Sequence, residues 1–121
     1  MTDKSSLARR LGDYGEKVVK GYLSAKGYEV IAEGYRAFGK EVDIIARHGG
    51  YTVFIEVKYR RGLNYGRPIE AVDQKKLQNI IECALGYMQE HGKPDDDMRI
   101  DILEVFGKEF LDINHVENVS I

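Results

Sequence analysis

The sequence predicts an α/β fold, with a central mixed sheet flanked by helices and elements in the order α-β-β-β-α-β-β. Three observations predict this class: two stretches with helical spacing of apolar residues, two apolar stretches around a Gly-Gly pair, and two later apolar stretches. A chain of 121 residues is long enough to form one domain with a substantial core. We therefore expect a single domain over residues 1–121, with residues 1–6 flexible.

The first helix is expected over residues 7–26, where apolar side chains recur at intervals of three and four. Leu11, Val18 and Tyr22 fall on one side of this helix, and Gly27 fits its C-terminal end. Residues 28–32 are apolar enough to predict the first strand.

The most informative stretch is a hairpin, predicted from residues 41–46 and 53–58 on either side of Gly49-Gly50. Folding about this pair, with a four-residue loop from His48 to Tyr51, makes paired residue numbers sum to 99. A shift of one residue would mix charged and aliphatic side chains on one face, which burial penalises. The aliphatic pairs expected on one face are Val42–Val57, Ile44–Ile55 and Ala46–Val53.

On the other face of the hairpin, Asp43 lies opposite Glu56, and Glu41 lies opposite Lys58. Two carboxylates directly opposite each other repel, and a divalent cation would offset that cost. Mg²⁺ prefers a few carboxylate oxygens together with water and phosphate. Lys58 follows Glu56 by two residues on the same strand face, so the pattern is that of a metal-dependent, phosphodiester-cleaving site.

The second half of the chain predicts a loop, a helix and two strands. Residues 60–67 contain two glycines and three arginines and predict an exposed basic loop. Helical spacing follows over residues 68–88, and residues 92–97 break the pattern. Residues 99–106 and 110–116 predict two closing strands.

The charge distribution favours a nucleic-acid partner. The whole chain has a net charge of −2, yet residues 36–76 carry +4 and the remainder −6. A phosphate backbone could approach this positive region. On charge alone, a solvated charged surface remains an equally good interpretation.

Composition also bears on the cellular location. No apolar run approaches the ~18 residues that span a membrane, and the first residues lack the apolar stretch of a signal peptide. Cys83 is the only cysteine, which rules out an internal disulfide and fits a reducing compartment. We therefore expect a cytoplasmic protein that does not associate with membranes.

Two further charged residues border the expected core. Glu16 aligns with Val19 and Leu23 on the first helix, so it either points towards the metal site or reaches solvent. Lys76 falls inside the apolar arc of the second helix. It either extends to the rim of that arc or enters the site as a phosphate contact.

Several spaced motifs lie between Leu11 and Val119: Gly15-Glu16, Gly39-Lys40-Glu41-Val42-Asp43-Ile44-Ile45-Ala46, Phe54-Ile55-Glu56-Val57-Lys58-Tyr59-Arg60, Tyr65-Gly66-x-Pro-x-Glu-Ala-Val, Lys76, Ala84-x-x-Tyr87 and Arg99-Ile100-Asp101. In this order and spacing they resemble the YraN-type uncharacterised protein family. That family is similar to the restriction-endonuclease-like PD-(D/E)XK superfamily, with archaeal Holliday-junction resolvases among its closer relatives. The resemblance implies a restriction-endonuclease-like α/β sandwich.

The resemblance also implies a role for individual residues. Glu16 matches the helix-borne acid, Asp43 the central metal aspartate, Glu56 the second metal carboxylate and Lys58 the catalytic lysine. The backbone carbonyl of Val57 could complete the coordination of Mg²⁺ or Mn²⁺.

Two functions from different classes follow. The first is a metal-dependent endonuclease that hydrolyses phosphodiester bonds in DNA rather than RNA, with branched or damaged structures as candidate substrates. The second is a nucleic-acid-binding accessory protein with little or no turnover. Related resolvases act as dimers, so a homodimer is an open expectation, and a plain structural domain is a third interpretation. The phosphate contacts expected are Arg36, Arg60, Arg61, Arg67 and Lys76.

Overall fold

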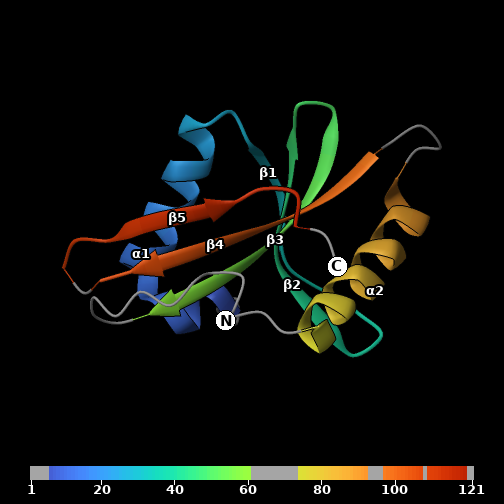
Figure 1. Ribbon diagram of the computed structural model, residues 1–121, viewed down its shortest axis with the longest axis horizontal. Helices are drawn as coiled ribbons and strands as arrows, with labels where there is room; N and C mark the ends of the chain where they lie inside the picture. The colour runs from blue at the N-terminus through green and yellow to red at the C-terminus, as the bar shows by residue number, and fades with distance from the viewer. Residues whose placement is uncertain (1–5, 61–73, 93–96, 108, 120–121) are drawn as a thin grey trace, which may run out of the picture.

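The computed structural model describes residues 6–60, 74–92, 97–107 and 109–119. In these ranges the chain forms two helices and five strands in the expected order (Figure 1), which confirms the predicted α/β class. The expectations for residues 1–5 and for the basic loop over 61–67 lie outside the described residues. The elements are α1 (Ser6–Ala25), β1 (Glu29–Ala37), β2 (Lys40–His48), β3 (Tyr51–Arg60), α2 (Gln74–His91), β4 (Asp97–Phe106) and β5 (Asp112–Val116).

The five strands form one mixed sheet in the order β1-β2-β3-β4-β5. β3 and β4 are parallel, and the other neighbouring strands are antiparallel. Parallel neighbours need a crossover connection, and α2 lies in the segment between these two strands. Neither α1 nor α2, as described, combines the length and apolar character needed to cross a bilayer.

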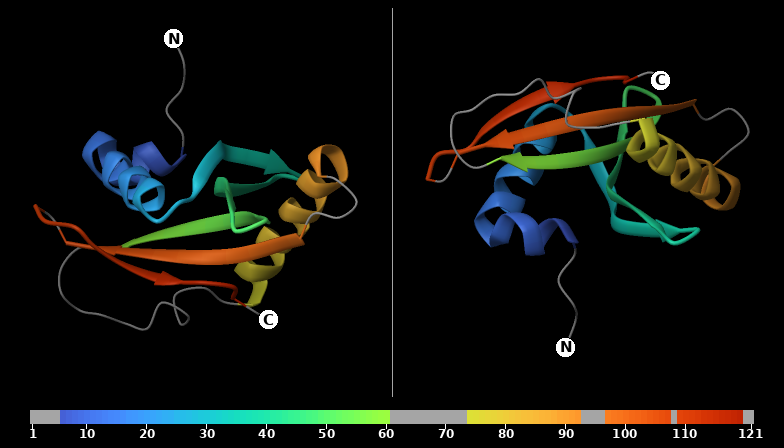
Figure 2. Two further views of the ribbon diagram at one scale, coloured as in Figure 1. Left: turned by 90° about the horizontal axis from the view of Figure 1, so that it is seen from above. Right: turned by 60° about the horizontal axis from the view of Figure 1, so that its bottom comes forward.

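Each face of the sheet packs against one helix, so the central strands are buried on both sides (Figures 1 and 2). Ile44 and Ile55 face α1, whose Val19 and Leu23 are fully buried. The alternate side chains of the same strands face α2. Those residues and their partners on the helix are Ile45, Phe54, Leu77, Ile80, Cys83 and Ala84.

The hairpin between β2 and β3 has the predicted register. His48 pairs with Tyr51 and Ile44 with Ile55, so paired numbers sum to 99 as expected. The turn contains two residues rather than four, with φ of 56° at Gly49 and 83° at Gly50. A two-residue turn with positive φ at both positions matches the twist of the strands, and glycine adopts it without strain.

The ladder between β2 and β3 ends at Ile44–Ile55, one pair before the expected Asp43–Glu56 pair. Beyond this point β2 and β3 diverge (Figures 1 and 2). The expected aliphatic pair therefore does not form: Val57 packs on the α1 side, whereas Val42 packs on the α2 side. The hairpin predicted from the sequence is therefore too long. Alternation of apolar and polar residues does not show where a side chain replaces a backbone acceptor and ends the ladder.

The first helix is interrupted at Gly12, where φ is 75° and ψ is 172°. The expected continuous helix over 7–26 is therefore two helical pieces that lie at an angle (Figure 2). Glycine tolerates this positive φ, which most other residues avoid. Leu7, at 1% exposure, anchors the first piece in the core on the α1 side of the sheet.

Candidate metal centre and its surrounding cations

The carboxylate of Asp43 lies at the point where the hairpin ladder stops. Its Oδ2 accepts the backbone N–H of Val57 at 2.8 Å. In a ladder continued with the same register, that N–H would donate to the carbonyl of Val42. The side chain has replaced the backbone acceptor, so β2 leaves β3 here and a carboxylate faces the opening.

Arg10 occupies this opening from the first piece of α1. Its Nη1 donates to the carbonyl oxygen of Val57 at 2.8 Å, and its Nη2 donates to Oδ1 of Asp43 at 2.6 Å. These two oxygens are among the predicted metal ligands. Sequence reasoning missed Arg10, and its only signal is the spacing of three from the core residue Leu7.

Glu56 is the second carboxylate of the site and is only 3% exposed. Burial, together with the negative charge of Asp43, raises the pKa of Glu56 to about 7, although nearby cations oppose this shift. One of those cations is Lys76 of α2, whose Nζ lies 3.5 Å from Oε1 of Glu56. The ammonium group of Lys76 thus reaches an acid of the site while its side chain is 41% exposed, and its contact with phosphate stays a prediction.

The raised pKa of Glu56 predicts that the Glu56→Gln variant is more stable than the wild type in alkaline solution. Between the ordinary value of 4.5 and about 7, the folded carboxyl keeps a proton that the unfolded chain loses. Wild-type stability therefore falls as pH rises through this window. We expect glutamine, which cannot ionise, to raise the free energy of unfolding by about 3 kcal/mol at pH 8 and by less than about 1 kcal/mol at pH 5.

Urea unfolding at the two pH values measures this effect. The control is Glu90→Gln, which makes the same substitution at an exposed position of α2 and should change stability little at either pH. A Glu56→Gln variant that is no more stable than the wild type at pH 8 contradicts the predicted cost of the buried charge.

Lys58 lies beside a third carboxylate that the sequence reasoning did not select. Its partner in the parallel ladder is Glu104 of β4, which is fully buried. The expected neighbour, Glu41, instead pairs with Arg36 of β1. The available signal was a glutamate between Ile102 and Phe106, at a position where strand alternation predicts an apolar residue.

The structure does not bring Glu16 together with the other two acids. Glu16 pairs with Lys20 at 2.8 Å on its own helix, and Lys20 also pairs with Glu33 of β1. Across the described ranges, no three acidic, histidine or cysteine side chains are arranged to hold a metal ion. Lys20 binds the carboxylate of Glu16 on the same helix. The cation next to Asp43 is instead the guanidinium of Arg10.

The predicted phosphate contacts are placed only in part. Arg36 is exposed and pairs with its cross-strand neighbour Glu41 at 3.0 Å. The side chain of Arg60, together with Arg61 and Arg67, lies outside the part of the chain that is described. Their contact with nucleic acid stays a prediction.

Comparison with known sequences assigns the family. The uncharacterised protein family UPF0102 matches residues 15–105, which is most of the chain. The chain belongs to this family. The match confirms the YraN-type resemblance of the motifs, which include Asp43, Glu56 and Lys58.

Individual UPF0102 proteins match over nearly their whole length. The protein from Alkaliphilus metalliredigens is 41% identical over 104 residues, covering 85% of this chain and 91% of the relative. One from Parafrankia sp. strain EAN1pec is 41% identical over 100 residues, covering 83% and 85%. One from Clostridium acetobutylicum is 36% identical over 115 residues, covering 93% and 94%.

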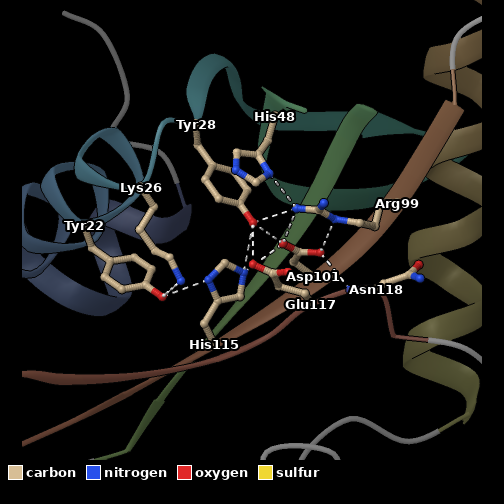
Figure 3. A network of polar contacts seen from close by, with 9 residues as sticks. All are labelled: Tyr22, Lys26, Tyr28, His48, Arg99, Asp101, His115, Glu117 and Asn118. Carbon is tan, nitrogen blue, oxygen red and sulfur yellow. Dashed lines mark hydrogen bonds and ion pairs between the residues drawn. The ribbon is translucent and has the colours of Figure 1, made fainter. Parts of the chain in front are cut away.

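This UPF0102 member also contains a second buried charged network, centred on Asp101 of β4 (Figure 3). Arg99 donates to both carboxylate oxygens, Tyr28 donates to Oδ2, and the backbone N–H of Asn118 donates to Oδ1. His115 lies 2.8 Å from Oδ2. Burial alone would raise the pKa of Asp101, but these partners outweigh burial and hold that pKa well below its usual range.

The Asp101 network ties together distant parts of the chain. It joins the turn between α1 and β1 to β4, to β5 and to the segment after β5, where Val119 adds a backbone hydrogen bond to Ile100. Every oxygen of the carboxylate has at least two partners. This saturation indicates a structural role rather than a second reactive site.

Proposed function

We propose that this UPF0102 protein is a Mg²⁺- or Mn²⁺-dependent nuclease that hydrolyses phosphodiester bonds in DNA, including branched or damaged structures. One observation carries the proposal: the buried carboxylates of Asp43 and Glu56 interact across the point where β2 and β3 separate. Lys58 follows on β3, and the carbonyl of Val57 opens towards the same place.

The donor set fits a divalent cation. Two carboxylates and a backbone carbonyl are the hard oxygen ligands that Mg²⁺ and Mn²⁺ accept. A cationic group, the guanidinium of Arg10, is already bound by two of these oxygens. Asp43, Glu56 and the Val57 carbonyl would hold the ion.

The residues around the ion would have separate roles in hydrolysis. When bound, the cation lowers the pKa of water and offsets negative charge on the scissile phosphate. Lys58 would orient the attacking water or neutralise the charge that develops on the phosphate. Arg36 and Lys76 would bind neighbouring phosphates, as would the three arginines of residues 60–67.

The test is a cleavage assay on labelled linear, nicked, flapped and four-way DNA, with single-stranded DNA and RNA alongside. Each substrate is incubated with Mg²⁺, Mn²⁺ or EDTA. We expect DNA cleavage that requires a metal ion and falls by about 10²–10³-fold in Lys58→Ala. Lys75→Ala, an exposed lysine of α2, is the control and should retain cleavage.

One observation favours the second candidate, a nucleic-acid-binding accessory protein. A permanent guanidinium between Asp43 and Val57 would neutralise the site without any metal. In that case the protein binds DNA in a salt-sensitive manner and cuts none of the substrates with either metal. That combination would overturn the nuclease proposal.

A further inference from the structure

We infer that Arg10 is a displaceable internal cation: its guanidinium occupies the metal position and must leave for a divalent ion to bind. The inference rests on the proposed function in one respect, the assignment of Asp43 and Val57 as metal ligands. It goes beyond that function because it assigns the first piece of α1 a role in controlling metal binding.

Arg10 and a divalent ion compete for one position, the one that bridges the Asp43 carboxylate and the Val57 carbonyl. Nη2 of Arg10 lies 2.6 Å from Oδ1 of Asp43, and Nη1 lies 2.8 Å from the carbonyl oxygen of Val57. A divalent ion would approach these oxygens to about 2.0–2.2 Å, inside the volume that the guanidinium fills. Docking of Arg10 across both oxygens therefore excludes an ion that bridges the same two oxygens from this side.

The arrangement keeps the ligands in place until the ion arrives. The N–H of Val57 holds Oδ2 of Asp43. The guanidinium of Arg10 offsets the negative charge of that carboxylate and donates a hydrogen bond to the Val57 carbonyl, where the ladder ends. A buried carboxylate beside a second one would be strongly disfavoured without a compensating cation. Arg10 thus preserves the geometry of the site while lowering its affinity for metal.

Arg10 can leave without disturbing the core. Its side chain is 37% exposed, whereas that of Asp43 is 6% exposed, so the guanidinium reaches the buried acid from the solvent side. The pair is therefore buried on the side of the acid and open on the side of the arginine, so water or an incoming ion can reach the guanidinium without entering the core. Leu7 holds the first piece of α1 in the core, so a change in the Arg10 side chain alone is enough to open the site.

The test measures Mn²⁺ binding by titration calorimetry, and by the electron paramagnetic resonance of free Mn²⁺, rather than cleavage. We expect Arg10→Gln to bind Mn²⁺ about tenfold more tightly than the wild type, equivalent to about 1.4 kcal/mol. Arg10→Lys keeps the charge but cannot bridge both oxygens, so it should also bind more tightly than the wild type. Lys17→Gln removes an equal charge elsewhere on α1 and should match the wild type.

The outcomes separate this inference from the proposed function. Equal Mn²⁺ affinity in wild type, Arg10→Gln and Arg10→Lys, with binding lost in Asp43→Asn, overturns the inference and leaves the metal site intact. Tighter binding in Arg10→Gln alone overturns it too, since a long-range charge effect then accounts for the change. No Mn²⁺ binding by any variant overturns both the metal site and the role of Arg10.

Discussion

Replacing Asp43 by asparagine is expected to abolish metal-dependent cleavage, lowering the rate by about 10³-fold or more. Asparagine has the same shape, and its side-chain oxygen can still accept the Val57 N–H that now lies 2.8 Å from Oδ2. What it lacks is the negative charge that would hold the ion, together with the second acceptor oxygen that now binds the half-exposed Arg10. The fold should therefore survive while the chemistry is lost, and parallel cleavage assays and urea unfolding curves measure the two effects.

Asp112→Asn is the matched control, since it makes the same change at an exposed position on β5. It should cleave as the wild type does. Cleavage that persists in Asp43→Asn at the wild-type rate is incompatible with the proposed mechanism. Cleavage lost together with the folded state would point instead to the hydrogen bond with Val57.

The largest loss of stability is expected from Asp101→Asn. Arg99, whose side chain is only 10% exposed, would lose the carboxylate that binds it at both oxygens. Removing one partner of a buried ion pair leaves an uncompensated charge, so we expect the free energy of unfolding to fall by about 3–5 kcal/mol. Urea unfolding at pH 7 measures this loss, and the control Asp112→Asn should change stability by less than about 0.5 kcal/mol.

The pH dependence supplies an independent check on the same network. The pKa of Asp101 is depressed in the folded state, so its contribution is complete above the ordinary value of 3.8 and is lost as pH falls below it. Wild-type stability should therefore drop more steeply below pH 4 than that of Asp101→Asn. Parallel curves for the two proteins would show that Asp101 carries no stabilising charge.

The elements and the central register follow from local patterns. Alternation along β2 and β3 selects one pairing, because a shift of one residue would bury charged side chains beside aliphatic ones. The glycines at positions 49 and 50 then fix the turn, since few other residues adopt positive φ twice in succession. The same register brings Asp43 and Glu56 near each other, so both candidates can be recognised from the sequence alone.

The residues that complete the site lie far apart in the sequence, and no local pattern connects them. Arg10 reaches Asp43 across 33 positions, and Lys58 meets Glu104 through a parallel pairing of β3 and β4. Glu16 is the opposite case: it was predicted as a metal ligand from the resemblance, but Lys20 on its own helix binds its carboxylate.

Periodicity and turn chemistry act over a few residues, so the chain alone specified the order of elements, the hairpin register and the pair of acids. The end of the ladder at Asp43, the break at Gly12 and the choice of cation at the site depend on which charged groups meet once the helices pack on the sheet. Which charged groups pair is decided by competition between partners that are distant in the sequence. For buried charges, the choice of partner changes the free energy of folding by several kcal/mol.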